Sequence, residues 1–152
     1  MSDYATLLKK LRADIKNLNL KRHKLKEHQK SMLDFIEGRK SSSQYVLNGQ
    51  IFQLTRGNEE FGFEHILKQH YQDDSNGKLT PREILNIWML LERGSKVSDF
   101  EQSHKGNIAY KLFKEHNKIQ IRLMLINFKD KMIYRILTYY SDRENEETGD
   151  LS

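Results

Sequence analysis

Residues 119–140, IQIRLMLINFKDKMIYRILTYY, decide the fold class of this chain. Residues 119–128 and 132–140 are rich in apolar, β-branched and aromatic side chains, and the short polar segment KDK separates them. Two segments of this composition joined by a short turn predict a pair of antiparallel strands. A similar segment, residues 108–113, precedes them, so the C-terminal third is predicted to form an antiparallel meander.

Alternation along these strands assigns side chains to two faces of the sheet. Ile119, Ile121, Leu123 and Leu125 share the face that we expect to lie against helices. In the last strand, Thr138 and Tyr140 share a face with Met132, Tyr134 and Ile136. An open face is expected to carry Lys111, Arg122, Thr138 and Tyr140. Cations, a hydroxyl and an aromatic ring suit a phosphate and a stacked base, but they are also ordinary residues of a solvated sheet face.

Two short helices are predicted before the sheet. Residues 61–71 place Phe63, Ile66, Leu67 and His70 on one face. The second helix begins with Thr80 as its N-cap, followed by Pro81 and Glu83, and runs to about residue 93. We expect Ile84, Leu85, Trp88 and Leu91 on its buried face.

An Asn48-Gly49 pair between β-branched and aromatic residues predicts a hairpin over residues 45–55. Helices that precede a sheet of sequential strands indicate an α+β fold in which helices cover one face of an antiparallel β-sheet. We expect residues 41–141 to form this domain.

Residues 1–40 are predicted to form one long basic helix, running from about residue 3 to residue 37. Its apolar residues recur at heptad spacing, as in a coiled-coil seam. The members of the seam are Tyr4, Leu8, Leu11, Ile15, Leu18, Leu25, Met32 and Ile36. Such a helix could form a homodimer with a second copy, lie along its own domain, or tether the domain to a larger assembly.

Composition limits the remaining classes. The 152 residues carry a net charge of +5 and no cysteine, which excludes disulfides and thiolate metal sites. The positive charge suits RNA or another anionic partner, although solubility alone would also account for it. No apolar run is long enough to cross a membrane, so we expect a soluble, cytoplasmic protein. The acidic residues 142–152 are expected to form a disordered tail.

Six histidines remain as the chemically active residues. His65 and His70 are five residues apart, so their side chains should diverge by about 140° on a helix and not form a metal pair. His23, His28 and His116 are expected to be exposed. No metal site, cofactor motif or serine nucleophile is indicated. Chemistry that needs only histidine, cations and hydroxyls includes RNA cleavage by its own 2′-hydroxyl.

Three short motifs occur in an order that resembles the barnase–EndoU–colicin–RelE-like nucleases associated with phages and toxins. Residues 61–70, FGFEHILKQH, are similar to the G-x-x-H-I-x-x-x-H helix of that group. Residues 79–84, LTPREI, and 92–94, ERG, are similar to the helix and glycine that follow it. Residues 136–140, ILTYY, are similar to its terminal strand.

The resemblance implies a metal-independent ribonuclease of barnase/RelE-like fold. It implies His65 and His70 as acid and base, with Thr138 positioning the phosphate. RNA, with tRNA among its forms, and an antitoxin or immunity protein are the implied partners, and a delivered toxin would act in the cytoplasm of a target cell. From their charge and location, Lys105 and Arg122 are further candidates for phosphate binding, beside Lys111 and Tyr140 on the open face.

Two other functions are compatible with the sequence. The first is a non-catalytic RNA- or protein-binding module that uses the heptad-patterned helix. The charge of this region supports it, since the first 40 residues carry eleven Lys and Arg against five acidic residues. The second is an inactive nuclease-like domain that serves as a structural part of a phage or mobile element.

Overall fold

The predicted meander forms the middle of a larger sheet, which a computed structural model describes for residues 3–92, 96–104, 107–116, 119–127 and 133–143. The strands are β1 (Ser42–Leu47), β2 (Gln50–Thr55), β3 (Lys96–His104), β4 (Asn107–His116), β5 (Ile119–Asn127) and β6 (Ile133–Ser141). The helices are α1 (Tyr4–Lys16), η1 (Arg22–Lys24), α2 (Glu27–Ile36), α3 (Gly62–His70), α4 (Pro81–Leu85) and α5 (Met89–Glu92).

Six strands pair in the order β1-β2-β6-β5-β4-β3. Strands β3 to β6 are antiparallel neighbours, which confirms the meander, and helices combined with this sheet confirm the α+β class. The sheet is mixed, however, because β2 pairs with β6 in parallel. Between β2 and β6 the chain passes through α3, α4, α5 and three strands. A connection of this length permits a parallel pairing of the two strands. Strand β3 was not predicted.

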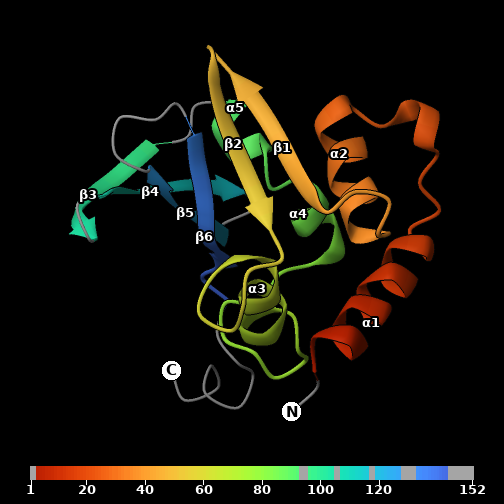
Figure 1. The fold of residues 1–152 in the computed structure, drawn as a ribbon. Coiled ribbons are helices and arrows are strands. Elements are labelled where there is room, and N and C mark those ends of the chain that lie inside the picture. Colours follow the sequence, from red (N-terminus) through yellow and green to blue (C-terminus); the bar gives the residue numbers. More distant parts are fainter. Residues whose placement is uncertain (1–2, 93–95, 105–106, 117–118, 128–132, 144–152) are drawn as a thin grey trace.

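The β1–β2 hairpin turns at Asn48-Gly49, as predicted. Asn48 has φ 51° and Gly49 has φ 79°. Two positive φ values define the type I′ turn that matches the twist of the strands, and asparagine and glycine adopt them at low cost. The hairpin projects from the body of the molecule (Figure 1).

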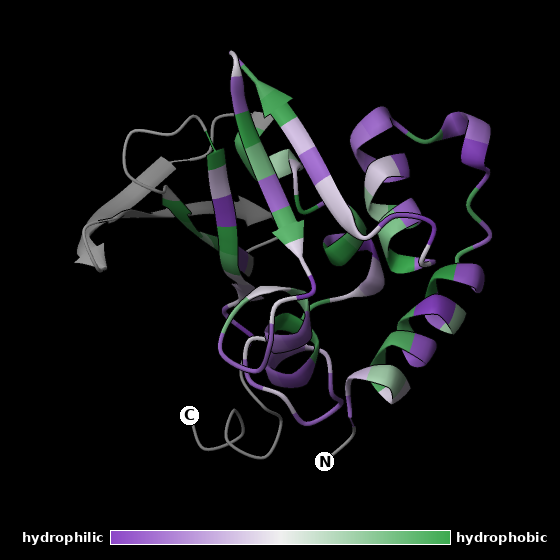
Figure 2. Cartoon of the chain, viewed as in Figure 1, coloured by the Kyte–Doolittle hydropathy of each residue, from purple (hydrophilic) through white to green (hydrophobic). Residues whose placement is uncertain are grey.

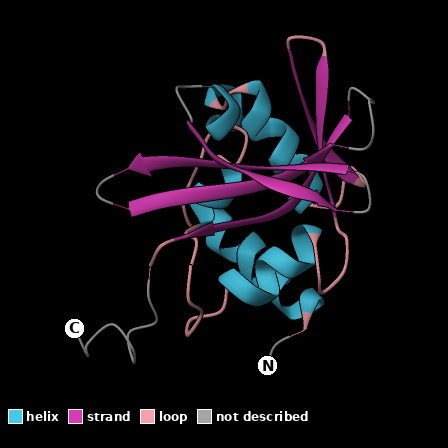
Figure 3. Cartoon of the chain, turned by 90° about the vertical axis from the view of Figure 1, so that its left-hand side faces the viewer, coloured by secondary structure: helices cyan, strands magenta, loops and turns pink. Residues whose placement is uncertain are grey.

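The helices gather on one side of the sheet and at the end of its strands, where α3 reaches Tyr140 of β6 (Figure 1 and Figure 3). In Figure 3 the strands cross in front of the helices, so the viewer faces the side of the sheet that the helices leave uncovered. The core between the layers includes Leu11 from α1, Leu67 from α3, and the fully buried Trp88. Leu123 and Leu125 of β5 face this core as the alternation predicted. Among the described residues no helix could span a membrane, since none is both long and apolar enough.

The prediction of a single long N-terminal helix is wrong. α1 ends at Lys16, and α2 begins only at Glu27. Between them the chain turns at Asn19, which adopts a positive φ of 55°. Asparagine tolerates this conformation and favours helix ends.

Each of the two N-terminal helices is amphipathic (Figure 2) and buries its own apolar side in the core. The buried residues are Leu7, Leu11 and Ile15 from α1, and Met32, Phe35 and Ile36 from α2. The heptad pattern therefore reflects packing on the domain itself, the second of the arrangements considered. A homodimer through this region stays a prediction, now without the continuous seam that suggested it.

The helix predicted from residue 80 begins as expected and then breaks. Thr80 accepts a hydrogen bond from the Glu83 amide at 3.1 Å, and Glu83 accepts one from the Thr80 amide at 2.9 Å. This reciprocal pair is a capping box. α4 stops at Leu85, and α5 starts at Met89. Between them Trp88 is fully buried and its indole N–H donates to Ser43 Oγ at 2.9 Å, an anchor that ties the break to β1.

A bulge in β6 overturns part of the predicted face assignment. Leu125 pairs with Ile136, but Met124 pairs with Thr138, so β6 has one more residue than β5 at this point. An extra residue reverses the alternation beyond it. Ile136 and Tyr139 are consequently both buried, and Thr138 lies on the face opposite to Ile136.

The end of β6 is tied to α4 by an ion pair that extends the domain past its predicted boundary. Arg143 donates two hydrogen bonds to the Glu83 carboxylate, at 2.6 and 2.8 Å. Burial alone would raise the pKa of Glu83, but the hydrogen bonds from Arg143 and Thr80 outweigh burial and lower it. Arg143 was predicted to belong to the disordered tail. The rest of that tail, residues 144–152, lies outside the described residues.

We expect Arg143→Ala to lower the free energy of unfolding by about 2 kcal/mol, because it leaves the partly buried Glu83 carboxylate without its bidentate partner. Urea denaturation measures the change. Lys30→Ala serves as the control, since Lys30 pairs with Glu27, a side chain that is 91% exposed. That exposed pair should contribute no more than about 0.5 kcal/mol. Equal effects of the two substitutions would contradict the assigned role of Arg143.

Candidate active site

The loop between β2 and α3 determines where α3 begins. Gly57 and Gly62 both have positive φ, and a Cβ on Gly57 would lie 2.1 Å from the Phe61 carbonyl oxygen. Only glycine permits so close an approach of two backbone segments. The Glu64 amide donates to the Arg56 carbonyl at 2.8 Å, and the Arg56 side chain pairs with the Glu64 carboxylate at 3.0 Å. These contacts fix α3 next to β6.

This placement brings three of the predicted site residues together. The ring centroids of His65 and His70 are 5.9 Å apart, with the planes at 77°. The His70 ring stacks on Tyr140 of β6 with a centroid distance of 5.3 Å and an angle of 26°. The expected divergence of the two histidines described only their Cα–Cβ directions, whereas the ring positions also depend on χ angles and on hydrogen bonds.

Backbone carbonyls orient both imidazole rings. His65 Nδ1 lies 2.9 Å from the Glu59 carbonyl oxygen, and His70 Nδ1 lies 3.0 Å from the Asn76 carbonyl oxygen. A carbonyl oxygen only accepts hydrogen bonds, so Nδ1 must carry the proton in both rings. In the neutral form, Nε2 then holds the lone pair and can take up a proton.

Burial lowers the pKa of His70 below its usual 6.5, and the nearby His65 acts in the same direction. The hydrogen bond to Asn76 opposes this shift without cancelling it. His70 is therefore neutral at pH 7, with an unprotonated Nε2. A histidine in this state is suited to accept a proton from a substrate.

The uncovered face of the sheet continues from Tyr140. Directly opposite residues of an antiparallel pair share a face, and Arg122 pairs with Tyr140 while Met124 pairs with Thr138. Lys111 pairs with Met124, so its register position lies on the same face. The register thus places on one face all four residues that the sequence assigned to the open face. Lys105 lies outside the described residues.

Thr138 and Arg122 supply polar atoms to this face. The Thr138 hydroxyl oxygen is buried and has no hydrogen-bond partner among the described residues. Buried hydroxyls are rarely left unsatisfied, so a further acceptor or donor is expected there. Arg122 donates to the Gln120 side chain at 2.9 Å, which uses one of its five N–H groups.

Sequence reasoning missed the groups that orient the histidines. Backbone carbonyls, here those of Glu59 and Asn76, have no signature in a sequence. Gly77 belongs with these groups, because a Cβ on it would lie 2.9 Å from His70 Nδ1 and 3.0 Å from the Ser141 carbonyl oxygen. Its position directly after Asn76 was the only available signal.

Of the other histidines, His28 contradicts the prediction of exposure. It is 5% exposed and lies at the interface of α2 with the hairpin, where its ring is at 90° to that of Tyr45 with a centroid distance of 6.4 Å. Met32, one turn further along α2, is also fully buried, so His28 belongs to the buried side of this helix. His23 is exposed, as predicted. The side chains of His104 and His116 lie outside the described part of the chain.

Within the described ranges, no three histidine or acidic side chains are grouped in a way that could hold a metal ion. Comparison of the chain with protein-family models, with curated proteins and with solved structures finds no match.

Gly77→Ala is expected to disturb the site specifically. The added Cβ meets His70 and the Ser141 carbonyl, and the positive φ of 67° adds a backbone cost of about 1–2 kcal/mol. Gly49→Ala is the matched control, because Gly49 has φ +79° and no atom within 4 Å of the added Cβ. Urea denaturation should show a larger loss for Gly77→Ala. Only that variant should shift the imidazole NMR signals of His70, and an unchanged His70 spectrum would contradict the proposed close approach.

The lowered pKa of His70 predicts a pH dependence of stability. Unfolded His70 binds a proton at its ordinary pKa of 6.5, whereas folded His70 binds it only at lower pH. The free energy of unfolding is therefore not reduced by His70 above pH 6.5. It decreases as the pH falls from 6.5 toward the pKa of folded His70, because the unfolded state binds the proton more readily. His70→Gln should flatten this part of the curve of unfolding free energy against pH, whereas the exposed His23→Gln should not. An NMR titration that gives His70 a pKa of 6.5 or higher would disprove the shift.

Proposed function

We propose that this protein is a metal-independent endoribonuclease in which His65 and His70 provide acid and base catalysis. The observation that carries the proposal is the pair of imidazoles 5.9 Å apart, both with Nδ1 directed to a backbone carbonyl. Two oriented histidines are sufficient for a reaction in which the substrate supplies its own nucleophile, and RNA does so through its 2′-hydroxyl.

His70 is the better candidate for the base because burial keeps it neutral. It takes the proton of the 2′-hydroxyl, whose oxygen then attacks the adjacent phosphorus. The bond from phosphorus to the 5′-oxygen breaks, and His65 in its protonated form donates a proton to that leaving oxygen. The products are a 2′,3′-cyclic phosphate and a free 5′-hydroxyl, so no metal or cofactor enters the balance.

The uncovered sheet face supplies the binding groups in this proposal. Arg122 donates hydrogen bonds to the phosphate oxygens, on which negative charge grows in the transition state. The Thr138 hydroxyl, which is buried and without a partner among the described residues, is the second donor and must be uncovered when RNA binds. Tyr140, which stacks on His70, offers an aromatic surface to a nucleobase of the RNA. Lys111, and Lys105 just before β4, complete the predicted set of cations.

The setting is proposed on the resemblance to toxin- and phage-associated nucleases. RNA is the substrate, with tRNA as one form to be tested, and an antitoxin or immunity protein is the expected protein partner. The cytoplasm, of the producing cell or of a target cell, is the proposed place of action.

Incubation with tRNA and with unstructured RNA in the presence of EDTA tests the activity. We expect cleavage with 2′,3′-cyclic phosphate ends, and a loss of about 10²–10⁴-fold in kcat/KM for His70→Ala and for His65→Ala. Thr138→Val keeps the side-chain shape, removes the hydroxyl and should weaken transition-state binding. His23→Ala is the control, as this exposed histidine lies in η1, away from α3.

If every RNA substrate stays intact, the proposed ribonuclease activity is refuted. A His65→Ala, His70→Ala double variant that cleaves at the wild-type rate would refute the proposed roles of the two histidines. Salt-dependent RNA binding without cleavage would instead favour the non-catalytic binding module.

A further inference from the structure

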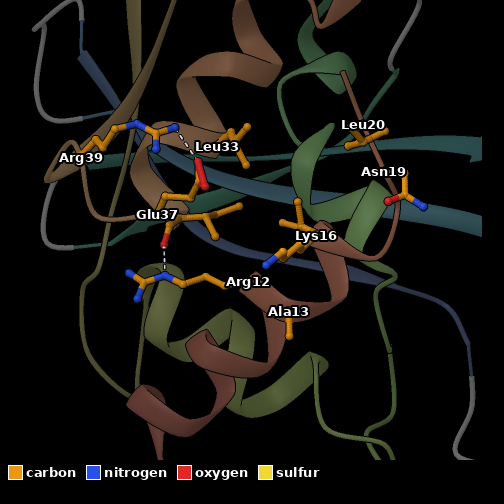
Figure 4. A pocket seen from close by; sticks show the side chains of 10 residues that line it. Arg12, Ala13, Lys16, Asn19, Leu20, Leu33, Glu37 and Arg39 are labelled. Carbon is orange, nitrogen blue, oxygen red and sulfur yellow. Dashed lines mark hydrogen bonds and ion pairs between the residues drawn. The ribbon is translucent and has the colours of Figure 1, made fainter. Parts of the chain in front are cut away.

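A groove of about 870 Å³ lies between α1 and α2, apart from the histidine site (Figure 4). Its floor is apolar. Ile15 and Ile36 are buried there, while Leu20 and Leu33 are only half-buried and leave apolar surface open to the groove. This volume falls within the range of ligand-binding clefts.

The walls of the groove carry positive charge. Arg39 is paired with Asp34 at 2.9 Å and with Glu37 at 2.5 Å, so its charge is compensated. Arg12 and Lys16, in contrast, form no ion pair with any described residue. Arg12 Nε donates to the Ile36 carbonyl at 2.7 Å, which holds the guanidinium at the groove without neutralising it.

An apolar floor beside two uncompensated cations fits an amphipathic anion. A nucleic acid fits less well, because no aromatic side chain lines the groove and bases would have nothing to stack on. A second copy of this chain would bring another basic surface, since the first 40 residues carry eleven Lys and Arg against five acidic residues. An amphipathic helix laid between two helices contacts the floor with its apolar side and the walls with its charged side.

We propose that the α1–α2 groove is a docking site for an acidic amphipathic helix of a partner protein. Its apolar side chains contact Leu20 and Leu33, and its carboxylates pair with Arg12 and Lys16. The proposal does not depend on the nuclease activity, because none of these residues belongs to the histidine site.

The test uses a synthetic, fluorescein-labelled peptide of about 18 residues, long enough to form a helix, with leucines at i, i+3, i+4 and i+7 spacing and glutamates elsewhere. Fluorescence anisotropy measures its Kd for the full chain. We expect saturable, salt-sensitive binding that Lys16→Glu weakens at least about tenfold. Lys16 is exposed, and its side chain forms no hydrogen bond or ion pair with a described residue, so this variant should fold, and thermal unfolding checks that it does. Arg12→Glu is the second variant and should act in the same direction.

Lys24→Glu is the matched control, since Lys24 is an exposed cation of η1 that does not line the groove. A version of the peptide with lysine in place of glutamate should not bind. Absence of saturable binding, or binding that Lys16→Glu and Lys24→Glu affect equally, would overturn the proposal. The proposal would also be overturned if Lys16→Glu left peptide binding intact and instead abolished binding of poly(U), or self-association measured by sedimentation.

Discussion

Strand β6 is hydrogen-bonded on both edges, to β2 in parallel and to β5 in the antiparallel direction, and the remaining elements are arranged around it. The strand comes last in the meander, yet it lies inside the sheet because the N-terminal hairpin adds to its other edge. Its end is secured as well. The Ser141 amide donates to the Gly77 carbonyl, the Arg143 carbonyl accepts from the Gly77 amide, and the Arg143 side chain pairs with Glu83 of α4. A centrally paired strand is among the last parts of a fold to open, which makes β6 a rigid support for a site.

The histidine pair combines this rigid strand with adaptable loops. Tyr140 comes from β6, whereas the carbonyls that orient His65 and His70 come from the loops before and after α3. Half-burial of His70 lowers its pKa, so the same contacts that pack the ring also prepare it as a base. The packing of this ring and its proton affinity therefore depend on the same contacts, and the proposed mechanism relies on both.

The N-terminal helices illustrate how one periodicity permits two different packings. Heptad spacing and an amphipathic helix of a single domain both place apolar residues three and four positions apart. The chain resolves the ambiguity near Asn19, which has a positive φ, because the first helix ends there and α2 packs separately, against β1. The break also leaves the groove between the two helices, with Arg12 and Lys16 on its walls.

The sequence by itself determined the features that depend on neighbouring residues. These are the Asn48-Gly49 turn, the Thr80–Glu83 capping box, the helix that carries His65 and His70, and the apolar side of β5. Tertiary structure alone decided the break after Lys16, the parallel pairing of β2 with β6, and the bulge that places Ile136 on the face opposite to Thr138 and Tyr140. It also decided the contact of His70 with Tyr140. These features arise from contacts between residues distant in the chain, and their energies exceed the local preferences that a sequence pattern reports.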